Sequence, residues 1–315
     1  MNILITEPLD FNPEQIQVLE KLGTLYQGPF SRKNLLKAIR NIDVLIIRLG
    51  HKIDKELLDQ ACNLQYILTP TTGINHIDSS EAEKRNIQII SLKGETDFLE
   101  TIPSTAEHSL SLMLSLIRKI PAAHNHVLKG EWNRDKFKSH NLNSYKLGIL
   151  GYGRVGKQMA GYAEVFKMPW IFYDIDPKLK SHQESEKDLI SFLKKVDILS
   201  IHIPLNQETK NFINASNLKF LKKGSFIVNT SRGEVIEDEA LTALIQNGHI
   251  AGFATDVLVS EIDEVKRRKN PLLKLAREFD NIIITPHIAG ATYESMWLTE
   301  KFIIEKWITT FSCKK

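Results

Sequence analysis

Short apolar runs alternate with amphipathic stretches along the first part of the chain. The runs have the length and β-branched content of buried strands, whereas the stretches between them place apolar residues at helical spacing. Predicted strands cover residues 3–6, 44–48, 64–68 and 87–90, and predicted helices cover 13–22, 55–61 and 80–85. Strands that alternate with helices in this way indicate a parallel α/β domain.

The pattern changes at residue 104, where a long apolar stretch begins. Ser104 and Glu107 stand at the spacing of a capping box, which predicts a helix from Ser104 to Ile120. Apolar residues occupy most sides of this helix, so we expect it to be buried between two domains or two subunits. Pro121 should end its strongest part, and residues 124–145 form a polar segment that contains several aromatic side chains.

A second alternation of strands and helices starts at residue 147. Six predicted strands cover residues 147–150, 170–173, 198–203, 225–230, 250–256 and 282–285. Helices are predicted at 155–166, 189–194, 215–221 and 238–246, and a last amphipathic helix covers 293–311. Six strands are typical of a doubly wound sheet, in which ligands bind outside the carboxyl ends of the strands. The residues just after the strands are therefore site candidates: Asp174, Pro204, Arg232, Asp256 and His287.

The first of these six strands leads into a turn that carries Gly151, Gly153 and Gly156. In such a motif the first glycine allows a tight turn, the second lets a pyrophosphate approach bare backbone, and the third lets the helix lie close to its strand. The helix N-terminus then faces the phosphates. Asp174 ends the next strand about 20 residues downstream, where an acidic side chain can accept both hydroxyls of an adenosine ribose. The complete order of strand, turn, helix, strand and acid predicts a dinucleotide site.

Composition and charge narrow the class of protein. A length of 315 residues suits two domains, and a net charge of +3 with scattered basic residues indicates neither nucleic-acid nor membrane binding. The basic run 266–269 is expected to be a solvated loop. Cys62 and Cys313 form no spaced pair, the N-terminal MNILITEP shows no secretion signal, and the apolar run 110–117 is too short to span a bilayer. We therefore expect a cytoplasmic protein without a structural metal.

Eight segments of the chain resemble the D-isomer-specific 2-hydroxyacid dehydrogenases, most nearly the 3-phosphoglycerate dehydrogenase branch. They are TTGINHID, STAEHSLSLML, LGILGYGRVGKQ, FYDID, HIPLNQETKNFIN, IVNTSRGEVIEDEAL, GFATDVLVSE and ITPHIAGAT. The resemblance implies an α/β protein with two doubly wound parallel-sheet domains. A Rossmann NAD-binding domain (102–289) would be inserted into a flavodoxin-like substrate domain (1–101, completed by 290–315). The helices that cross from one domain to the other at these two boundaries would form the hinge. It does not extend to the C-terminal regulatory domain of many phosphoglycerate dehydrogenases, so feedback by serine is not expected.

The resemblance also implies two catalytic side chains that follow strands. Arg232 could clamp a substrate carboxylate and polarise the adjacent carbonyl, although its position alone equally suits an ordinary loop arginine. His287 would be the acid and base of the reaction, although a lone histidine is often a core residue.

An acidic partner for the histidine is expected in the loop after residue 257. Glu261 stands at the matching place, but Ile262 replaces the proline that follows this acid in the family. Glu264 and Asp263, in an insertion-like stretch, stay open as alternatives if the loop is shifted.

The resemblance implies further contacts with NAD and with substrate. Cofactor contacts are expected from Gly151, Gly153, Arg154, Val155, Gly156, Asp174, Ile203, Pro204, Thr230, Ser231, Asp256 and Gly290. Backbone amides of Thr72, Gly73 and Ile74 are expected to hold the substrate carboxylate. Arg48 matches an arginine that faces substrate in phosphoglycerate dehydrogenases, whereas the following Leu49-Gly50-His51 depart from that branch. Residues 93–104 are longer than the usual connection and should reshape the cleft wall or form a solvated loop.

The sequence therefore predicts an oxidoreductase that transfers a hydride between NAD(H) and a D-2-hydroxy acid or 2-oxo acid, phosphorylated or not. A homodimer is expected through the nucleotide domain, because helix 104–120 and the aromatic segment around Trp132 and Phe137 would expose apolar surface on a monomer, and because relatives dimerise through the matching region. Two alternatives stay open. Some relatives are NAD-sensing dimeric corepressors, which bind the cofactor without turnover, and formate dehydrogenases resemble the family but carry glutamine where Glu261 stands.

Overall fold

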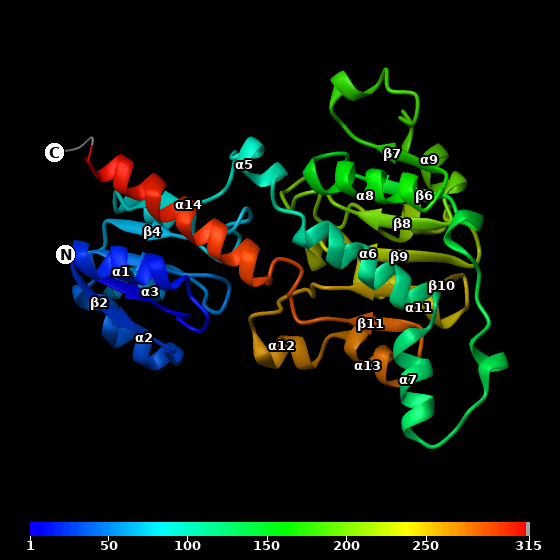
Figure 1. The fold of residues 1–315 in the computed structure, drawn as a ribbon, viewed down its shortest axis with the longest axis horizontal. Helices are drawn as coiled ribbons and strands as arrows, with labels where there is room; N and C mark the ends of the chain where they lie inside the picture. Colours follow the sequence, from blue (N-terminus) through cyan, green and yellow to red (C-terminus); the bar gives the residue numbers. More distant parts are fainter. Residues whose placement is uncertain (313–315) are drawn as a thin grey trace. The chain divides into compact units, whose positions relative to one another are not determined.

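The chain divides into two compact units, each built on its own parallel sheet (Figure 1). Unit 1 comprises residues 1–101 together with the chain from Ala291 onward, and unit 2 comprises residues 102–290. The structure is a computed structural model that describes residues 1–312, so Cys313 lies outside the described part. Both predicted parallel sheets are confirmed.

Unit 1 contains a five-stranded sheet in the order β2-β1-β3-β4-β5. Its strands are β1 (Asn2–Ile5), β2 (Thr24–Gln27), β3 (Val44–Ile46), β4 (Tyr66–Leu68) and β5 (Gln88–Ile90). Its α-helices are α1 (Pro13–Leu22), α2 (Arg32–Ala38), α3 (Lys55–Gln60), α4 (Ser79–Lys84), α5 (Thr96–Glu100) and α14 (Tyr293–Ser312), and a 3₁₀ helix covers Ile39–Asn41. This is the flavodoxin-like order, whose direction of winding reverses between β1 and β3.

The sequence analysis did not predict three elements of unit 1, because they bury few apolar side chains. Strand β2 lies at the sheet edge and has no buried residue, and helix α2 buries only Leu35. The stretch 93–104, which was expected to reshape the cleft wall or to form a solvated loop, contains α5. Phe98 of α5 stacks on Phe302 of α14 with ring centroids 4.0 Å apart, which anchors this short helix.

Unit 2 contains a six-stranded parallel sheet in the order β11-β10-β9-β8-β6-β7. Its strands are β6 (Leu147–Leu150), β7 (Trp170–Tyr173), β8 (Ile198–Ile201), β9 (Ser225–Asn229), β10 (Ile250–Thr255) and β11 (Ile282–Ile284). A single bridge between Phe172 and Ser185 lies at the β7 edge, where the doubly wound order 3-2-1-4-5-6 has its third strand. The winding therefore reverses beside β6, the strand that leads into the glycine turn.

Eight α-helices accompany this sheet in the described chain. They are α6 (Ser104–Ile117), α7 (Ile120–Leu128), α8 (Arg154–Val165), α9 (Leu189–Lys195), α10 (Ala215–Leu218), α11 (Asp238–Gln246), α12 (Glu264–Arg268) and α13 (Pro271–Glu278). Short 3₁₀ helices cover Arg134–Phe137, Leu142–Ser144, Pro177–Leu179 and Gly233–Val235. No helix in the described part of the chain is both long enough and apolar enough to cross a membrane.

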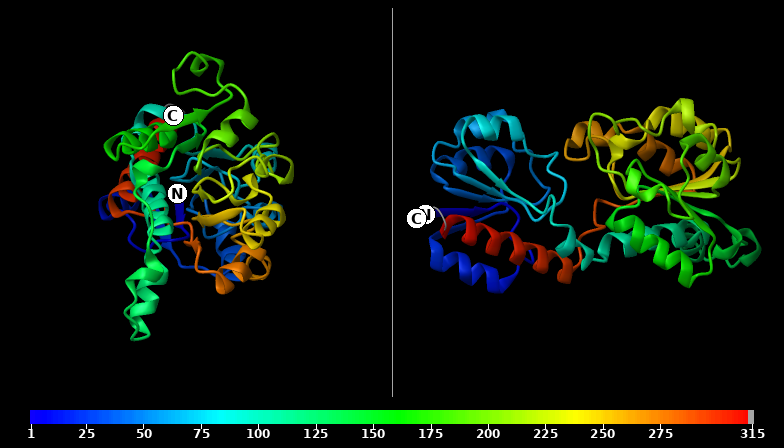
Figure 2. Two further views of the ribbon diagram at one scale, coloured as in Figure 1. Left: turned by 90° about the vertical axis from the view of Figure 1, so that its right-hand side faces the viewer. Right: turned by 90° about the horizontal axis from the view of Figure 1, so that it is seen from above.

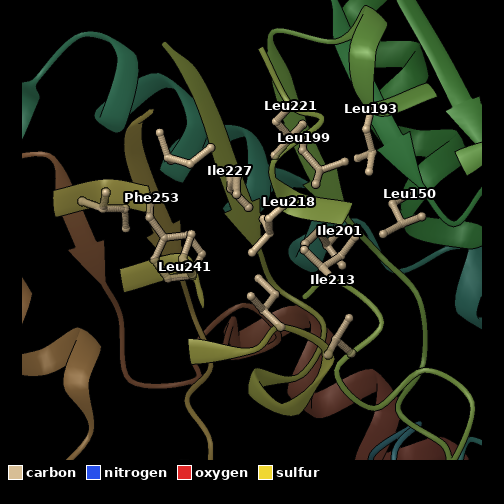
Figure 3. Packing of buried hydrophobic residues seen from close by; sticks show 14 of the residues in the cluster. Leu150, Leu193, Leu199, Ile201, Ile213, Leu218, Leu221, Ile227, Leu241 and Phe253 are labelled. Carbon is tan, nitrogen blue, oxygen red and sulfur yellow. The ribbon is translucent and has the colours of Figure 1, made fainter. Parts of the chain in front are cut away.

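Two apolar clusters cover the two faces of this sheet, because successive side chains of a strand point to opposite faces. Leu199 and Phe253 belong to the cluster under α9, α10, α11 and α13, whereas Ile198 and Ala254 belong to the cluster under α6 and α8. Figure 3 shows the first cluster, where side chains from β8, β9 and β10 lie close to Leu218 and Leu241 of the covering helices. This packing fixes the strand ends from which the candidate site is built.

Three local predictions in unit 2 are wrong. The Ser104 capping box does not form: Pro103 is the residue before α6, and the buried Ser104 hydroxyl has no partner among the described residues. Pro121 does not end the predicted helix: α6 already ends at Ile117, and Pro121 lies in the first turn of α7, where proline is tolerated because that backbone nitrogen needs no acceptor. The basic run 266–269 belongs mainly to α12, which Asp263 caps by accepting the Lys266 N–H at 3.1 Å.

A buried acid at the start of α11 makes stability depend on pH. Asp238 is buried, and its Oδ2 accepts the side-chain N–H of Asn270 at 2.8 Å. Burial raises the pKa of Asp238 to about 6, against the lowering effect of that hydrogen bond, and the charges of Glu239 and Glu234 raise it further. The folded protein therefore keeps a proton that the unfolded chain releases near pH 4.

We predict that Asp238→Asn stabilises unit 2 at pH 7 but not at pH 4. A raised folded pKa gives stability that is lost as the pH rises from about 4 through about 6, and two pKa units correspond to about 3 kcal/mol at most. The measurement is the guanidinium midpoint at both pH values. Asp280→Asn, at an exposed position of the same unit, is the control and should change neither midpoint. An equal shift at both pH values for Asp238→Asn would contradict the prediction.

Candidate active site

The glycine turn between β6 and α8 has the backbone of a phosphate cradle. Gly151 has a φ of +93°, and a Cβ there would lie 3.0 Å from the carbonyl carbon of His202. A Cβ at Gly156 would lie 2.2 Å from the Gly151 carbonyl oxygen, so α8 approaches the turn too closely for any side chain. A Cβ at Gly153 would have no heavy atom within 4 Å. The turn is thus tightly packed at Gly151 and Gly156, whereas space remains at Gly153, where a pyrophosphate would approach.

The Asp174 carboxylate is held beside this turn by two backbone N–H groups. Its Oδ2 accepts the Tyr152 N–H at 2.7 Å, and its Oδ1 accepts the Asp176 N–H at 2.9 Å. The Tyr152 ring stacks on Phe172 with centroids 4.0 Å apart, which fixes the middle of the turn against β7. Each carboxylate oxygen still has a lone pair free to accept a ribose hydroxyl.

Beside the turn, Arg154 begins α8 and His202 follows β8. Arg154 Nη1 donates to the Ile102 carbonyl at 2.8 Å, and burial lowers the pKa of its guanidinium. Burial lowers the pKa of His202 to about 3, and the charge of Arg154 lowers it further. The imidazole of His202, bonded to the Ser200 hydroxyl at 2.8 Å, is therefore neutral at pH 7. Val155, the next residue of α8, is half-buried.

Asp256, at the end of β10, organises the loop that carries His287. Its carboxylate is fully buried and accepts the Thr285 hydroxyl at 2.6 Å, the Ile288 N–H at 2.9 Å and the Ala289 N–H at 2.7 Å. His108 of α6 also contacts this group: its Nε2 lies 2.9 Å from the Thr285 hydroxyl and 3.3 Å from the Asp256 carboxylate. Burial alone would raise the pKa of Asp256, but these hydrogen bonds outweigh burial and hold it below its usual value. The residue is thus an anionic anchor at pH 7.

The loop holds His287 in an unusual backbone conformation. Its φ is +56°, in the left-handed region that a side chain with a Cβ seldom adopts, and its N–H donates to the Asp256 carbonyl at 2.9 Å. Backbone strain of this kind persists only where surrounding contacts over-determine it, and it is concentrated at functional sites.

Glu261 is the acid that contacts His287. Its Oε1 bonds to Nδ1 of the imidazole, and its Oε2 accepts the Leu258 N–H at 3.2 Å. The other two candidate acids are engaged elsewhere, because Glu264 pairs with Arg268 at 2.6 Å and Asp263 caps α12. A carboxylate only accepts, so Nδ1 carries the proton of this bond. His287 Nε2 makes no hydrogen bond within the described chain and remains available for a ligand.

Arg232 lies on a loop after β9 that Asn229 holds in shape. Asn229 is buried; its Oδ1 accepts the Ser231 N–H at 3.0 Å, and its Nδ2 donates to the Arg232 carbonyl at 3.0 Å. The guanidinium donates through Nη1 to the Ser231 carbonyl at 2.6 Å, and its other N–H groups have no acceptor among residues 1–312. Burial lowers the pKa of Arg232, while the charges of Glu261 and Glu234 oppose that effect.

The Arg232 loop and the Glu261 loop touch at a glycine. A Cβ at Gly233 would lie 2.3 Å from the backbone carbon of Leu258 and 2.4 Å from the nitrogen of Val259. Only glycine allows this close approach of the two loops. It brings Arg232 close enough to Glu261, the partner of His287, for the two charges to interact. The sequence analysis missed Asn229, Gly233 and His108, although the first two flank Arg232 in NTSRGE.

The other expected cofactor residues lie at strand ends of the same sheet. Thr230 donates or accepts a 2.7 Å hydrogen bond with the Ser109 hydroxyl, and the Ser231 hydroxyl bonds to Asn229 at 2.8 Å. Ile203 is half-buried and Pro204 exposed after β8, and Gly290 is exposed with open space where a Cβ would stand. No group of three or more metal-ligating side chains is found in the part of the chain that the structure describes.

The expected substrate residues belong to unit 1. Thr72, Gly73 and Ile74 follow β4, and none of their backbone N–H groups donates to an acceptor in the described chain. The Thr71 hydroxyl bonds to the Gly73 carbonyl at 2.9 Å and shapes this loop. Arg48 follows β3, but its guanidinium is already bonded to Glu300 within the same unit. Its expected contact with substrate stays a prediction.

Comparisons with known proteins agree with this geometry. The family model for the D-isomer specific 2-hydroxyacid dehydrogenase, NAD binding domain, matches residues 110–289. A glyoxylate reductase of Thermofilum pendens is 36% identical over 276 residues, which are 85% of this chain and 78% of that protein. A D-3-phosphoglycerate dehydrogenase of Methanocaldococcus jannaschii is 31% identical over 311 residues, 97% of this chain. The chain spans only 56% of that relative's length.

A solved structure extends the similarity to the whole fold. The crystal structure of a D-lactate dehydrogenase from Aquifex aeolicus, complexed with NAD and lactic acid, has a TM-score of 0.83 to this chain at 26% identity. The match covers 100% of this chain and 96% of that one.

We predict that Gly233→Ala damages the site more than the fold. The new methyl group must push the Leu258–Val259 backbone away from the Arg232 loop, so turnover should fall at least tenfold while the cofactor still binds at the glycine turn. Any steady-state rate measured with NADH, together with an NADH fluorescence titration, checks this. The control is Gly161→Ala in α8, where a Cβ meets nothing within 4 Å and alanine favours the helix. Equal activities of the two variants would contradict the prediction.

Proposed function

Because the chain belongs to the D-isomer-specific 2-hydroxyacid dehydrogenase family, whose NAD-binding domain covers residues 110–289, we propose that it interconverts a 2-oxo acid and a D-2-hydroxy acid. NAD is the cofactor of this domain. The observation that carries the proposal is the hydrogen bond between Glu261 and His287 beside the Arg232 loop. Proton transfer to a carbonyl oxygen needs such a pair, whereas cofactor binding alone does not.

NADH, when bound, supplies a hydride from its nicotinamide ring. In this proposal the unused N–H groups of Arg232 hold the substrate carboxylate and draw charge from the neighbouring carbonyl. In unit 1, the proposed substrate contacts are the free backbone N–H groups of Thr72, Gly73 and Ile74. His287 Nε2 donates the proton to the oxygen that becomes the hydroxyl, and it takes that proton back in the oxidation.

Glu261 supports this step through the other ring nitrogen. Its bond to Nδ1 fixes the orientation of the imidazole and places the exchangeable proton at Nε2. A carboxylate beside the ring also stabilises the positive charge that His287 carries before it donates. An NAD-sensing corepressor would not need this pair. Formate oxidation transfers a hydride without an acid and base for a hydroxyl, and formate dehydrogenases carry glutamine at the Glu261 position.

We also propose that the protein is a cytoplasmic homodimer that associates through unit 2. Figure 1 shows α7 and the segment that follows it extending away from the sheet of unit 2, and Figure 2 shows the same projection from a second side. The apolar side chains on this extension are open to solvent: Leu128 is 71% exposed and Trp132 88% exposed. Such a surface is typical of an interface between subunits.

The first test of the proposal is reduction of 2-oxo acids with NADH by wild type and by His287→Ala. Proton transfer contributes typically ~10²–10⁴-fold, so the variant should lose turnover by this factor while its affinity for NADH is kept. The measurements are NADH absorbance during turnover and NADH fluorescence on binding. His249→Ala is the control, because that imidazole bonds to the Leu221 carbonyl at the amino end of β10. If no 2-oxo acid is reduced, or if His287→Ala keeps full turnover, the proposal is wrong.

We predict a preference for NAD over NADP that depends on Asp174. A 2′-phosphate on the ribose would meet the negative charge at the end of β7. Asp174→Ser should raise the KM for NAD and reduce the preference, whereas Asp176→Ser, which removes an exposed charge two residues later, should change it less. Steady-state kcat/KM for the two cofactors is the readout. A wild-type kcat/KM with NADP equal to that with NAD would contradict this prediction.

We predict that Leu128→Asp dissociates the dimer. A charge in the middle of an apolar interface cannot be paired, so the association constant should fall steeply. Sedimentation at low micromolar concentration should show a dimer for wild type and a 36.0 kDa species for the variant. Lys129→Asp, on the same exposed extension but already polar, is the control. A monomeric wild type would refute the assembly.

A further inference from the structure

Helix α6 sends one imidazole to the loop that follows β11. The Thr285 hydroxyl oxygen lies 2.9 Å from Nε2 of His108 and 2.6 Å from Oδ1 of Asp256. The other ring nitrogen of His108, Nδ1, makes no hydrogen bond within the described chain. The three side chains therefore form one hydrogen-bonded row, with the threonine in the middle, and all of them belong to unit 2.

The direction of each hydrogen bond in this row follows from the carboxylate at its end. Asp256 is ionised at pH 7, and an ionised carboxylate only accepts. The single hydroxyl proton of Thr285 points to Asp256, because the other acceptor, the Thr255 carbonyl, is 3.5 Å away. The Thr285 oxygen can then only accept from His108. Nε2 of His108 therefore carries a proton and donates it, and Nδ1 of the neutral imidazole is the bare nitrogen.

The Asp256 carboxylate needs these donors because it is a buried charge. Its side chain is 0% exposed, and its one ion-pair partner among the described residues is His108 Nε2, at 3.3 Å. Burial raises the pKa of Asp256, but hydrogen bonds from His108, Thr285, Ile288 and Ala289 hold it below its usual value. A buried carboxylate that loses a donor is strongly destabilised. The imidazole of α6 thus supports the anion that holds the loop after β11.

Thr285 connects this anion to the backbone of His287. The His287 N–H is shared between the carbonyl oxygens of Asp256, at 2.9 Å, and of Thr285, at 3.0 Å. Thr285 therefore binds Asp256 through its hydroxyl and His287 through its carbonyl. The left-handed φ of +56° at His287 persists only while such contacts over-determine it. Without the donor from His108, the Thr285 hydroxyl could turn away from Asp256, and the loop would lose one of its supports.

We propose that His108 is a positioning residue of the reaction: by donating to Thr285, it keeps the loop that carries His287 in the conformation that proton transfer needs. The inference rests on the proposed function. His108 acts through Thr285 and Asp256, because it makes no hydrogen bond with His287 itself. Its removal should therefore lower kcat and leave the KM for NADH nearly unchanged.

His108→Leu and His108→Gln test the need for a donor. Leucine occupies the space without donating, whereas the side-chain N–H of glutamine can take the place of Nε2–H. With NADH and the 2-oxo acid that wild type reduces fastest, kcat of His108→Leu should fall roughly tenfold or more, because a small misplacement of a reacting group is costly. His108→Gln should recover most of that loss. A folded His108→Leu with the wild-type kcat, or a His108→Gln no faster than His108→Leu, overturns the inference.

Thr285→Val tests whether His108 acts through the threonine. Valine keeps the shape of threonine but has no hydroxyl, so kcat should fall as in His108→Leu. The two losses should combine to less than their product in the double variant, because the hydroxyl that His108 bonds to is already absent. Ser111→Ala is the control on α6, because the Ser111 hydroxyl bonds to the Glu107 carbonyl of the same helix, and it should leave kcat unchanged. Losses that multiply in the double variant overturn the inference.

Nitrogen NMR of the histidine side chains tests the proton position without any turnover. At pH 7 the signals of His108, identified by their absence from the spectrum of His108→Gln, should show a proton on Nε2. A tautomer with its proton on Nδ1 alone overturns the inference even in an active enzyme. If wild type reduces no 2-oxo acid, the proposed function fails instead, and the tautomer still decides whether His108 donates to Thr285.

Discussion

The buried carboxylate of Asp256 is the interaction on which the arrangement of the site depends. Asp256 follows β10. Its carboxylate accepts hydrogen bonds from a threonine hydroxyl and from two backbone N–H groups of the loop after β11. Those bonds hold His287 at a φ of +56°. A neutral residue of the same size could not accept so many donors, so the anion and the strained histidine backbone belong together.

The proposed catalytic constellation follows from how closely two loops approach each other in unit 2. Gly233 has no side chain, so the loop that carries Arg232 can lie directly against the Leu258–Val259 backbone. Glu261, three residues after Leu258, contacts His287. The group proposed to bind the substrate carboxylate and the group proposed to move a proton are thereby fixed by backbone contacts, which keep their geometry better than flexible side chains do.

Sequence reasoning could predict features that depend on local patterns. The strands of both sheets except β2, the glycine turn and the acid after β7 all follow from periodicity and spacing, and they are present. The pairing of Glu261 with His287 was harder to predict, because Ile262 stands where the resemblance expects proline, and Glu264 and Asp263 stayed open as alternatives to Glu261. The structure distinguishes these acids by the bond of Glu261 to His287 and by the bond that the Leu258 N–H donates to Glu261.

Features that depend on distant partners could not be predicted. Arg48 and Glu300 are 252 residues apart in sequence, so nothing near the arginine indicates that its charge is neutralised. The exposed edge strand β2 has no apolar alternation to detect. The capping box at Ser104 matched a pattern, but Pro103 is the cap residue of α6, and Ser104 is its first residue, with a buried hydroxyl.

The central claim is that Glu261 and His287 act as one proton-transfer unit, and a double-mutant cycle tests it most directly. The measurement is the rate of NADH oxidation in a single turnover for wild type, Glu261→Gln, His287→Ala and the double variant. Residues that act as a unit have non-additive effects, so the double variant should be no slower than His287→Ala alone. A double variant slowed by the product of the two single factors would show that the residues act independently and would contradict the account.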